Sequence, residues 1–503
     1  MSKIRKEQLD MSDALKSYIA GQWVLPTAGG TYEAINPATE EVCARVALCT
    51  PAEADAAVRA ARAAFDGWSQ TPLEARLALV EKLIAVFEAR YDEMVRAIST
   101  EMGAPFDLSH NSQAECGPGH LRATVEAARK MAWEYDVGAD GRVMHEPIGV
   151  AVLITPWNWP INQIATKVGP ALVSGCTMVL KPSELSPLSA QLFAEFVDEA
   201  GFPAGVFNMV HGTGVGIGET LTGHPEVDMI SFTGSTRAGI QIAKNAAETV
   251  KRVSQELGGK SANIIFADAD LEAAVTRGVL HCLENAGQSC NAPTRMLVEQ
   301  SVYDAAVAIA AQVAKDAKQG DPMEKGPHFG PVVSQQHFNK IQGLIQAGID
   351  EGAQVVTGGT GRSEGFSRGY YVKPTVFAGV HNKMTIAQEE VFGPVLVMIP
   401  FADEAEAVQI ANDVIYGLGS GVWTQSLNRA LGMAKKIRAG TVWVNTYRAV
   451  SFSMPFGGYK SSGLGRENGM DAINEYLHTK SVWVNTATGN SGNPFVMKTS
   501  APS

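Results

Sequence analysis

The spacing of hydrophobic and polar positions changes near residue 149. Before it, apolar residues recur three or four positions apart over long stretches, a spacing typical of amphipathic helices. We expect helices over 51–68, 73–102 and 114–133. Thr50-Pro51-Ala52-Glu53 predicts the start of the first one, with a Thr cap, Pro at the first helical position and Glu three residues after the cap. After a polar arm, the first quarter of the chain is therefore predicted to be mostly helical.

From Gly149 onward, short apolar runs alternate with amphipathic stretches. Such runs are typical of buried parallel strands with helices between them, as in an α/β fold. One connecting helix is expected to open at Pro187, with Ser186 as its cap, and to end at Gly201. Strands are expected at 150–155, 178–180, 206–210, 229–232, 263–266, 296–298, 395–399, 421–423 and 442–444.

Two segments fit neither pattern. Residues 133–145 are polar and interrupted by Gly, and residues 481–485 alternate between polar and apolar positions. We expect both to be strands that pair outside the main sheets, or else surface hairpins. Residues 486–503 are rich in Ser, Thr, Asn, Gly and Pro, and we expect them to form a loose tail.

Composition narrows the class of partner. The 503 residues carry a net charge of −11 and no extended Lys/Arg run, which argues against a nucleic-acid partner. The six cysteines are irregularly spaced, so we expect reduced thiols in a cytoplasm and no metal site. Residues 1–13 lack an apolar signal core, and no apolar run is long enough for a membrane span. A small molecule is the expected partner.

The first chemical feature is a thiol and a carboxylate 34 positions apart, Cys290 and Glu256. Cys290 ends Gly287-Gln288-Ser289-Cys290, after a helical stretch expected over 271–286. Glu256 opens Glu256-Leu257-Gly258-Gly259-Lys260, after a strand-like run. A thiol attacks a carbonyl to form a thioester, and a carboxylate activates the water that cleaves it. The alternatives are an inert buried Cys, the reading we keep for Cys282, and a solvated Glu at a turn.

Asn158 lies in Thr155-Pro156-Trp157-Asn158-Trp159-Pro160, directly after a buried strand. An amide held between two aromatic residues and two prolines can present its N–H donors rigidly to a developing oxyanion. The alternative is an ordinary turn Asn.

Two more segments suit a nucleotide. Lys181-Pro182-Ser183-Glu184 follows a strand and presents a cation and a carboxylate, which suit ribose hydroxyls or form an exposed ion pair. The run from Phe232 to Gly239 is expected to be a strand, a Gly-containing turn and a helix start, which together can hold a pyrophosphate. Neither this run nor Gly212–Gly218 has the Gly-x-Gly-x-x-Gly spacing of the common dinucleotide motif.

Together these segments resemble the NAD(P)-dependent aldehyde dehydrogenase superfamily from about Ile19 to Asn485. Residues 287–290 resemble its nucleophile motif, 256–260 its general-base motif and 156–160 its oxyanion motif. Two further segments match, Glu389–Pro394, whose second Glu and Phe hold the nicotinamide ribose and ring in the family, and Pro455–Lys460.

The resemblance implies an α/β fold with three parts. A Rossmann-like NAD-binding domain is expected at 1–130 and 147–258, and an α/β catalytic domain at 259–460. A small β bridging element that assembles a homodimer or homotetramer is expected at 131–146 and 477–490, followed by a tail at 491–503.

It also implies residue roles. The catalytic residues are expected to be Cys290, Glu256, Asn158 and, as a proton relay, Lys167. The expected cofactor-binding residues are Thr155, Pro156, Trp157, Lys181, Ser183, Glu184, Gly212, Phe232, Gly234, Ser235, Leu257, Glu390 and Phe392. The expected substrate tunnel contains Trp159, Thr166, Glu284, Arg448 and Phe456.

Three choices depend on single residues. A base at Glu256 predicts a free carboxylic acid as product, because acyl-CoA-forming relatives lack it. Glu184 favours NAD over NADP, since its carboxylate repels a 2′-phosphate. Arg448 either attracts a carboxylate-bearing semialdehyde or pairs with a neighbouring acid. The chain is therefore expected to be a hydrolytic aldehyde dehydrogenase, with a semialdehyde-specific enzyme and a catalytically silent scaffold as alternatives.

Overall fold

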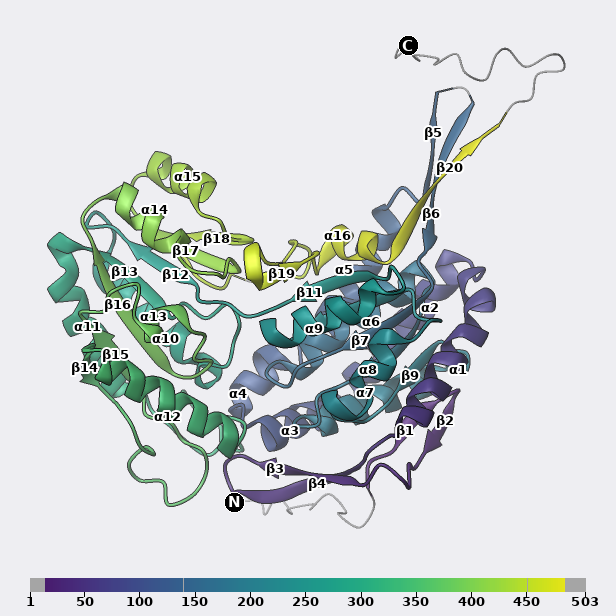
Figure 1. Cartoon of the computed structure of the whole chain (residues 1–503), viewed down its shortest axis with the longest axis horizontal. Helices are drawn as coiled ribbons and strands as arrows, with labels where there is room; N and C mark the ends of the chain where they lie inside the picture. Colours follow the sequence, from purple (N-terminus) through teal and green to yellow (C-terminus); the bar gives the residue numbers. More distant parts are fainter. Residues whose placement is uncertain (1–13, 139, 450, 485–503) are drawn as a thin grey trace.

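The computed structural model describes residues 14–138, 140–449 and 451–484. Two large sheets with their helices stand side by side, and a narrow third sheet projects from one end (Figure 1). The structure does not describe the expected tail at 486–503, the last position of the 481–485 segment, or the first 13 residues of the polar arm. In the part of the chain that is described, the helices are all too short or too polar to cross a membrane.

The first sheet has eight strands in the order β19-β11-β10-β7-β8-β9-β1-β2. The central five are parallel, and β1, β2 and β19 run antiparallel to their neighbours. The bounds are β1 Ser17–Ile19, β2 Gln22–Val24, β7 Val150–Ile154, β8 Thr177–Lys181, β9 Phe207–Met209, β10 Met229–Thr233, β11 Arg252–Glu256 and β19 Gly463–Leu464.

Helices cover both faces of this sheet, which is why the central strand β7 is apolar at every position. In β7, Val150 and Val152 pack with α1, α8 and α9, whereas Ala151 and Leu153 pack on the other side with α2, α5, α6 and α7. The helices are α1 Pro51–Ser69, α2 Leu73–Ala89, α5 Cys116–Lys130, α6 Pro160–Ser174, α7 Pro187–Ala200, α8 Gly214–Gly223 and α9 Thr236–Ala247.

The second sheet has the order β14-β15-β16-β13-β12-β17-β18 and is parallel except for β14. Its strands are β12 Ala262–Ile265, β13 Arg295–Glu299, β14 Gln354–Thr357, β15 Thr375–Ala378, β16 Val395–Phe401, β17 Gly419–Trp423 and β18 Thr441–Val444. Its helices are α10 Leu271–Leu283, α11 Tyr303–Asp316, α12 Gln335–Asp350, α13 Thr385–Gln388, α14 Glu404–Asn412 and α15 Leu427–Lys436. The expected α/β fold and its nine expected strands are confirmed.

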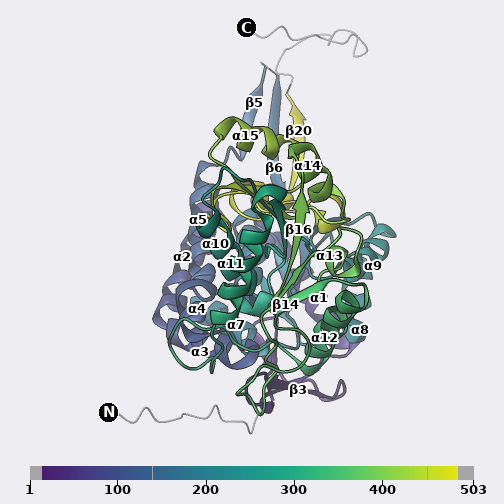
Figure 2. The ribbon, with the colours of Figure 1, turned by 90° about the vertical axis from the view of Figure 1, so that its left-hand side faces the viewer.

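The third sheet joins the two segments that fitted neither pattern. β5 (Glu134–Val137) and β6 (Gly141–Pro147) form a hairpin, and β20 (Leu477–Trp483) pairs antiparallel with β6. This sheet extends from the end of the molecule, with α16 (Gly469–Glu475) leading into β20 (Figures 1 and 2). The prediction of strands outside the main sheets is confirmed.

The first quarter differs from the expectation in two ways. The polar arm contains strands, namely β1, β2, and the hairpin of β3 (Thr31–Asn36) and β4 (Glu41–Ala47). The expected helix over 73–102 is interrupted at Arg90, whose backbone leaves the helical conformation (φ −111°, ψ 21°) between α2 and α3 (Tyr91–Met102). No Gly or Pro marks this break, so the pattern held no signal for it. Between α3 and α5 lie the single turn α4 (Phe106–Leu108) and a π-helical segment at Ser109–Gln113.

Of the two predicted helix caps, one is correct and one is wrong. Thr50 and Glu53 form the expected capping box of α1. Ser186 stands before α7, but its side chain makes no capping hydrogen bond. Instead the buried carboxylate of Glu101, on α3, accepts from the backbone N–H groups of Leu188 at 2.5 Å and Ser189 at 3.2 Å. The residues near the start of α7 could not predict this cap, because the carboxylate comes from another helix.

Candidate active site

Cys290 is positioned by an unusual turn after α10. The helix ends at Leu283 rather than at the expected Ala286, and Asn285, Ala286 and Gly287 follow with φ of 57°, 54° and 73°. Three consecutive left-handed residues reverse the chain. Gly287 is required there, because a Cβ would lie 2.1 Å from the carbonyl oxygen of Gly393. The turn leaves Cys290 partly exposed, whereas Cys282 is fully buried, as expected.

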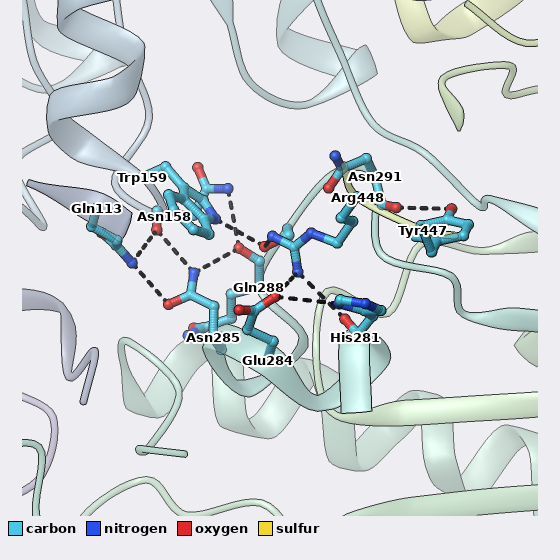
Figure 3. A network of polar contacts seen from close by, with 11 residues as sticks. Gln113, Asn158, Trp159, His281, Glu284, Asn285, Gln288, Asn291, Tyr447 and Arg448 are labelled. Atoms are coloured by element: carbon cyan, nitrogen blue, oxygen red, sulfur yellow. Dashed lines mark hydrogen bonds and ion pairs between the residues drawn. The ribbon is translucent and has the colours of Figure 1, made fainter. Parts of the chain in front are cut away.

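A network of amides holds this turn against the segment that carries Asn158 (Figure 3). The Asn158 side chain donates through Nδ2 to the Gln288 carbonyl at 3.1 Å. Asn285 donates to the backbone carbonyls of both Asn158 and Gln288, at 3.0 and 3.1 Å, and accepts from Gln113 at 3.0 Å. Sequence reasoning missed Gln113 and Asn285, since single amide residues carry no recognisable pattern.

Two donors near Cys290 remain available to a ligand. Asn158 has two amide N–H groups and uses one of them on Gln288. The backbone N–H of Cys290 has no acceptor among the described residues. Both expected oxyanion donors therefore retain an N–H that a substrate oxygen can accept.

Glu256 ends β11, as expected for a carboxylate presented at a strand terminus, and the two glycines after it allow close packing. A Cβ on Gly259 would lie 2.2 Å from the carbonyl oxygen of Cys290. A Cβ on Gly258 would lie 2.5 Å from Oε2 of Glu390, whose Oε1 accepts from the Gly259 N–H at 2.9 Å. The two glycines thus allow the segment after Glu256 to pack closely against both the backbone of Cys290 and the side chain of Glu390.

Both reactive groups have strongly raised pKa values. Burial first, and then the charge of Glu467, hold the pKa of the Glu256 carboxyl well above its usual range. Both oxygens of Glu256 lack a hydrogen-bond partner among the described residues. Burial, followed by the charges of Glu256 and Glu390, raises the pKa of the Cys290 thiol to about 12. Glu256 is thus close enough to Cys290 to influence its proton.

Lys167, on α6, is buried and paired with Glu467. Sequence reasoning missed Glu467, which lies seven positions beyond the end of the matched segment Pro455–Lys460. Its backbone pairs with that of Phe456, with N···O distances of 2.7 and 2.8 Å. The backbone of Phe456 therefore helps to position Glu467. Both members of this pair act electrostatically on Glu256: the charge of Glu467 raises the pKa of its carboxyl, and that of Lys167 lowers it.

The candidate cofactor residues lie along one edge of the first sheet. Because β7 to β11 are parallel neighbours, the segments that follow them meet at their carboxyl ends. The set comprises Thr155, Pro156 and Trp157 after β7, Lys181, Ser183 and Glu184 after β8, Gly212 after β9, Phe232, Gly234 and Ser235 at β10, and Leu257 after β11.

Individual contacts in this set fit an anionic, hydroxyl-bearing ligand. Lys181 is 4% exposed, donates to the Pro182 carbonyl at 2.8 Å and lies 3.6 Å from Glu184. Ser235 caps α9 through the N–H of Ala238 at 3.3 Å, so that this helix begins beside Gly234. The positive end of a helix stabilises an anion.

Trp157, which follows β7 of the first sheet, contacts Phe392, which precedes β16 of the second sheet. Their rings are 5.5 Å apart between centroids, and His337 of α12 packs against both. The His337 Nε2 donates to the Phe392 carbonyl at 2.6 Å, and burial lowers the pKa of His337 to about 4. His337 was not predicted, because an isolated His on a helix has no distinctive neighbours.

Three of the candidate tunnel residues, Trp159, Arg448 and Glu284, are linked to one another beside Ser289, the residue before Cys290. Trp159 donates through Nε1 to the Ser289 hydroxyl at 2.9 Å, and the Arg448 guanidinium lies over the Trp159 ring at 5.6 Å. Arg448 forms an ion pair with Glu284 at 2.7 Å (Figure 3). Thr166 is buried, and its hydroxyl donates to its own helix at the Gln163 carbonyl.

Comparison with known proteins gives a consistent result. Residues 23–482 match the sequence profile described as the Aldehyde dehydrogenase family. A Pseudomonas protein named 3-succinoylsemialdehyde-pyridine dehydrogenase is 51% identical over 473 residues, which cover 94% of this chain and 99% of that protein.

Solved structures agree at the level of the whole fold. An aldehyde dehydrogenase from Bartonella henselae is 50% identical, with a TM-score of 0.92 over 94% of this chain and 99% of that one. A variant of aldehyde dehydrogenase C from Pseudomonas syringae, in complex with NAD⁺ and octanal, is 47% identical, with a TM-score of 0.92 over 94% and 98% of the two chains.

Proposed function

This chain belongs to the aldehyde dehydrogenase family, and we propose that it oxidises an aldehyde to the free carboxylic acid with NAD, using Cys290 as nucleophile and Glu256 as base. The observation that carries the proposal is the packing of Gly259 against the carbonyl of Cys290. It brings the turn of the nucleophile and the strand of the base together, although 34 positions separate them in the sequence.

In the first step, the Cys290 sulfur attacks the aldehyde carbon. The free N–H of the Asn158 amide and the Cys290 backbone N–H donate to the oxygen that becomes negative. Because the pKa of the thiol is raised, its proton must leave as the attack proceeds. NAD, when bound, supplies the electron acceptor that turns the resulting thiohemiacetal into a thioester.

In the second step, Glu256 activates the water that cleaves the thioester. Its two unpaired oxygens can accept a proton from water, and a raised pKa makes the ionised carboxylate a stronger base. The Lys167–Glu467 pair provides the next groups to which that proton can pass. A carboxylate here supports a free acid as product.

The residues along the first sheet fit NAD. Lys181 is buried with three donors and a single close acceptor, and Glu184 lies beside it, so that the pair can bind the two hydroxyls of a ribose. Glu184 would repel a 2′-phosphate, which supports NAD over NADP. The complex of the P. syringae relative with NAD⁺ supports the same choice.

We infer that the three sheets have different roles. We assign cofactor binding to 1–130 with 147–258, catalysis to 259–460, and oligomerisation to 131–146 with 477–490. In the third sheet, β20 and β5 are both edge strands. Tyr135, Val137 and Trp483 are exposed on it, and large exposed apolar side chains are typical of a surface that binds another chain.

The deciding experiment compares Cys290→Ala and Glu256→Gln in rapid mixing with NAD and a neutral aldehyde. Glu256→Gln should retain a burst of reduced cofactor, equal in size to the enzyme concentration, followed by turnover slower by about 10²–10⁴-fold, since only water attack is impaired. Cys290→Ala should give neither burst nor turnover. Steady turnover by Cys290→Ala would contradict the proposal, as would the absence of a burst in Glu256→Gln.

A further inference from the structure

Arg448 lies beside the nucleophile and is largely buried. Its Nη2 donates to the hydroxyl of Ser289, the residue before Cys290, at 3.3 Å, and its guanidinium covers the Trp159 ring. Tyr447, its neighbour, donates to the Asn291 carbonyl at 3.0 Å, so the segment around Arg448 is fixed on both sides of Cys290 (Figure 3). A substrate bound at Cys290 on the Trp159 side lies within reach of this charge.

Glu284 neutralises the positive charge of Arg448 by forming an ion pair with it. Its Oε2 accepts from Arg448 at 2.7 Å and lies 3.8 Å from the His281 ring. Burial by itself would raise the pKa of Glu284, but the Arg448 charge and the His281 hydrogen bond bring it down to about 2. Glu284 is therefore ionised at neutral pH. Its side chain is 37% exposed whereas that of Arg448 is 8% exposed, which places the acid on the outer side of the pair.

Lys167, the buried cation whose charge acts on Glu256, is also neutralised. Lys167 is paired with Glu467. A carboxylate that leaves water to enter this region would thus meet two cations that are already neutralised by Glu284 and Glu467. Removing a carboxylate from water is costly unless a charged partner compensates for it.

We propose that Glu284 is a specificity-determining residue which, by neutralising Arg448, makes the site favour uncharged aldehydes over aldehydes that carry a carboxylate. The inference rests on the proposed aldehyde oxidation and names its substrate class. The binding of octanal, an uncharged aldehyde, by the P. syringae relative is consistent with it. Without Glu284, the guanidinium fork would be free to accept a carboxylate through two parallel hydrogen bonds.

The test compares 4-oxobutanoate with its methyl ester, which differ by one charge. The wild type should have a higher kcat/KM for the ester, and Glu284→Gln should shift the ratio toward 4-oxobutanoate by about tenfold or more, which corresponds to about 1.4 kcal/mol. Adding Arg448→Gln to Glu284→Gln should abolish the shift, because the guanidinium that Glu284→Gln leaves unpaired is then absent. Glu404→Gln is the matched control, since Glu404 is equally exposed and paired with Lys436 far from Cys290.

A second readout needs no turnover. Calorimetry with succinate, which cannot react, should show tighter binding to Glu284→Gln than to the wild type, and no such gain in the double variant. An unchanged substrate ratio together with unchanged succinate binding would overturn the inference, as would a wild type that prefers 4-oxobutanoate. If no aldehyde is oxidised, the proposed function fails, while the succinate measurement still judges the role of Glu284.

Discussion

At the residue scale, the reactivity of Cys290 depends on its surroundings more than on the thiol itself. All six cysteines are free, and burial raises the pKa of each of them. Cys290 shares partial exposure with Cys43, and what distinguishes it is the charges of Glu256 and Glu390 and two free N–H donors beside it. The raised pKa predicts a neutral thiol in the protein without substrate or cofactor.

The alkylation of Cys290 by iodoacetamide should therefore depend steeply on pH. Since only the thiolate reacts and the pKa is about 12, the rate should rise about tenfold per pH unit from about pH 7 to 10 without reaching a plateau. Glu390→Gln removes a negative charge, so that the pKa falls and the rate at a given pH increases. Mass spectrometry of the labelled peptide measures both effects, with Cys290→Ala as the blank. A plateau below pH 9 would contradict the raised pKa.

Gly259→Ala tests the close approach of the two motifs. The added Cβ would meet the Cys290 carbonyl at 2.2 Å, so the nucleophile turn must shift. A displacement of about 1 Å at the reacting atoms can lower kcat on the order of 10²-fold. Steady-state kinetics measure this loss. Gly343→Ala on α12 is the control, because a Cβ there meets no atom within 4 Å. Equal kcat values for the two variants would show that the close approach is unimportant.

At the element scale, α3 and α7 are coupled by one buried carboxylate. Glu101 accepts from two backbone N–H groups at the start of α7 and from the Ser189 hydroxyl. These are donors that a helix cannot satisfy internally. α7 packs on the first sheet behind β8, the strand that leads into Lys181 and Glu184. The cap thus stabilises the layer beneath the candidate cofactor residues.

Glu101→Ala should destabilise the protein by about 1–3 kcal/mol, because it leaves buried donors without an acceptor. Thermal unfolding followed by circular dichroism measures the lowered midpoint. Glu199→Ala, at the exposed end of α7, should leave the midpoint nearly unchanged. If Ser186→Ala lowered the midpoint more than Glu101→Ala does, the cap would be the local serine after all.

At the scale of the whole molecule, the candidate active site lies between the two large sheets. Asn158 and Glu256 come from the first sheet, and Cys290 and Glu390 from segments joined to the second. The third sheet stands apart from this junction (Figure 2). Its separation suggests that it can be altered without direct damage to the site.

Trp483→Glu should weaken the proposed oligomer. The indole is 81% exposed at the end of an edge strand, and a carboxylate would be costly to bury in an interface. Light scattering after size exclusion should show a smaller assembly than the wild type. Leu25→Glu, a similar change at another exposed apolar position, is the control. An unchanged mass for Trp483→Glu, or an equal loss in both variants, would contradict the assignment.

Much of the fold was predictable because the signals are local. Strands buried on both faces, such as β7, are apolar throughout, and Gly201 ends α7 in the left-handed conformation that Gly adopts readily. The failures occur where the cause is distant or weak. The β3–β4 hairpin is half exposed, Arg90 interrupts a continuous apolar pattern, and Glu101 caps a helix from 87 positions away.

The sequence by itself determined the family, the α/β fold and the expected order of chemical groups, because each rests on residue types at fixed spacing. Tertiary structure alone decided that Gly259 packs on the Cys290 carbonyl, that Glu467 pairs with Lys167 and that Glu284 neutralises Arg448. These contacts join residues 31, 300 and 164 positions apart. Their energies depend on distance and burial, which arise only when the sheets pack together.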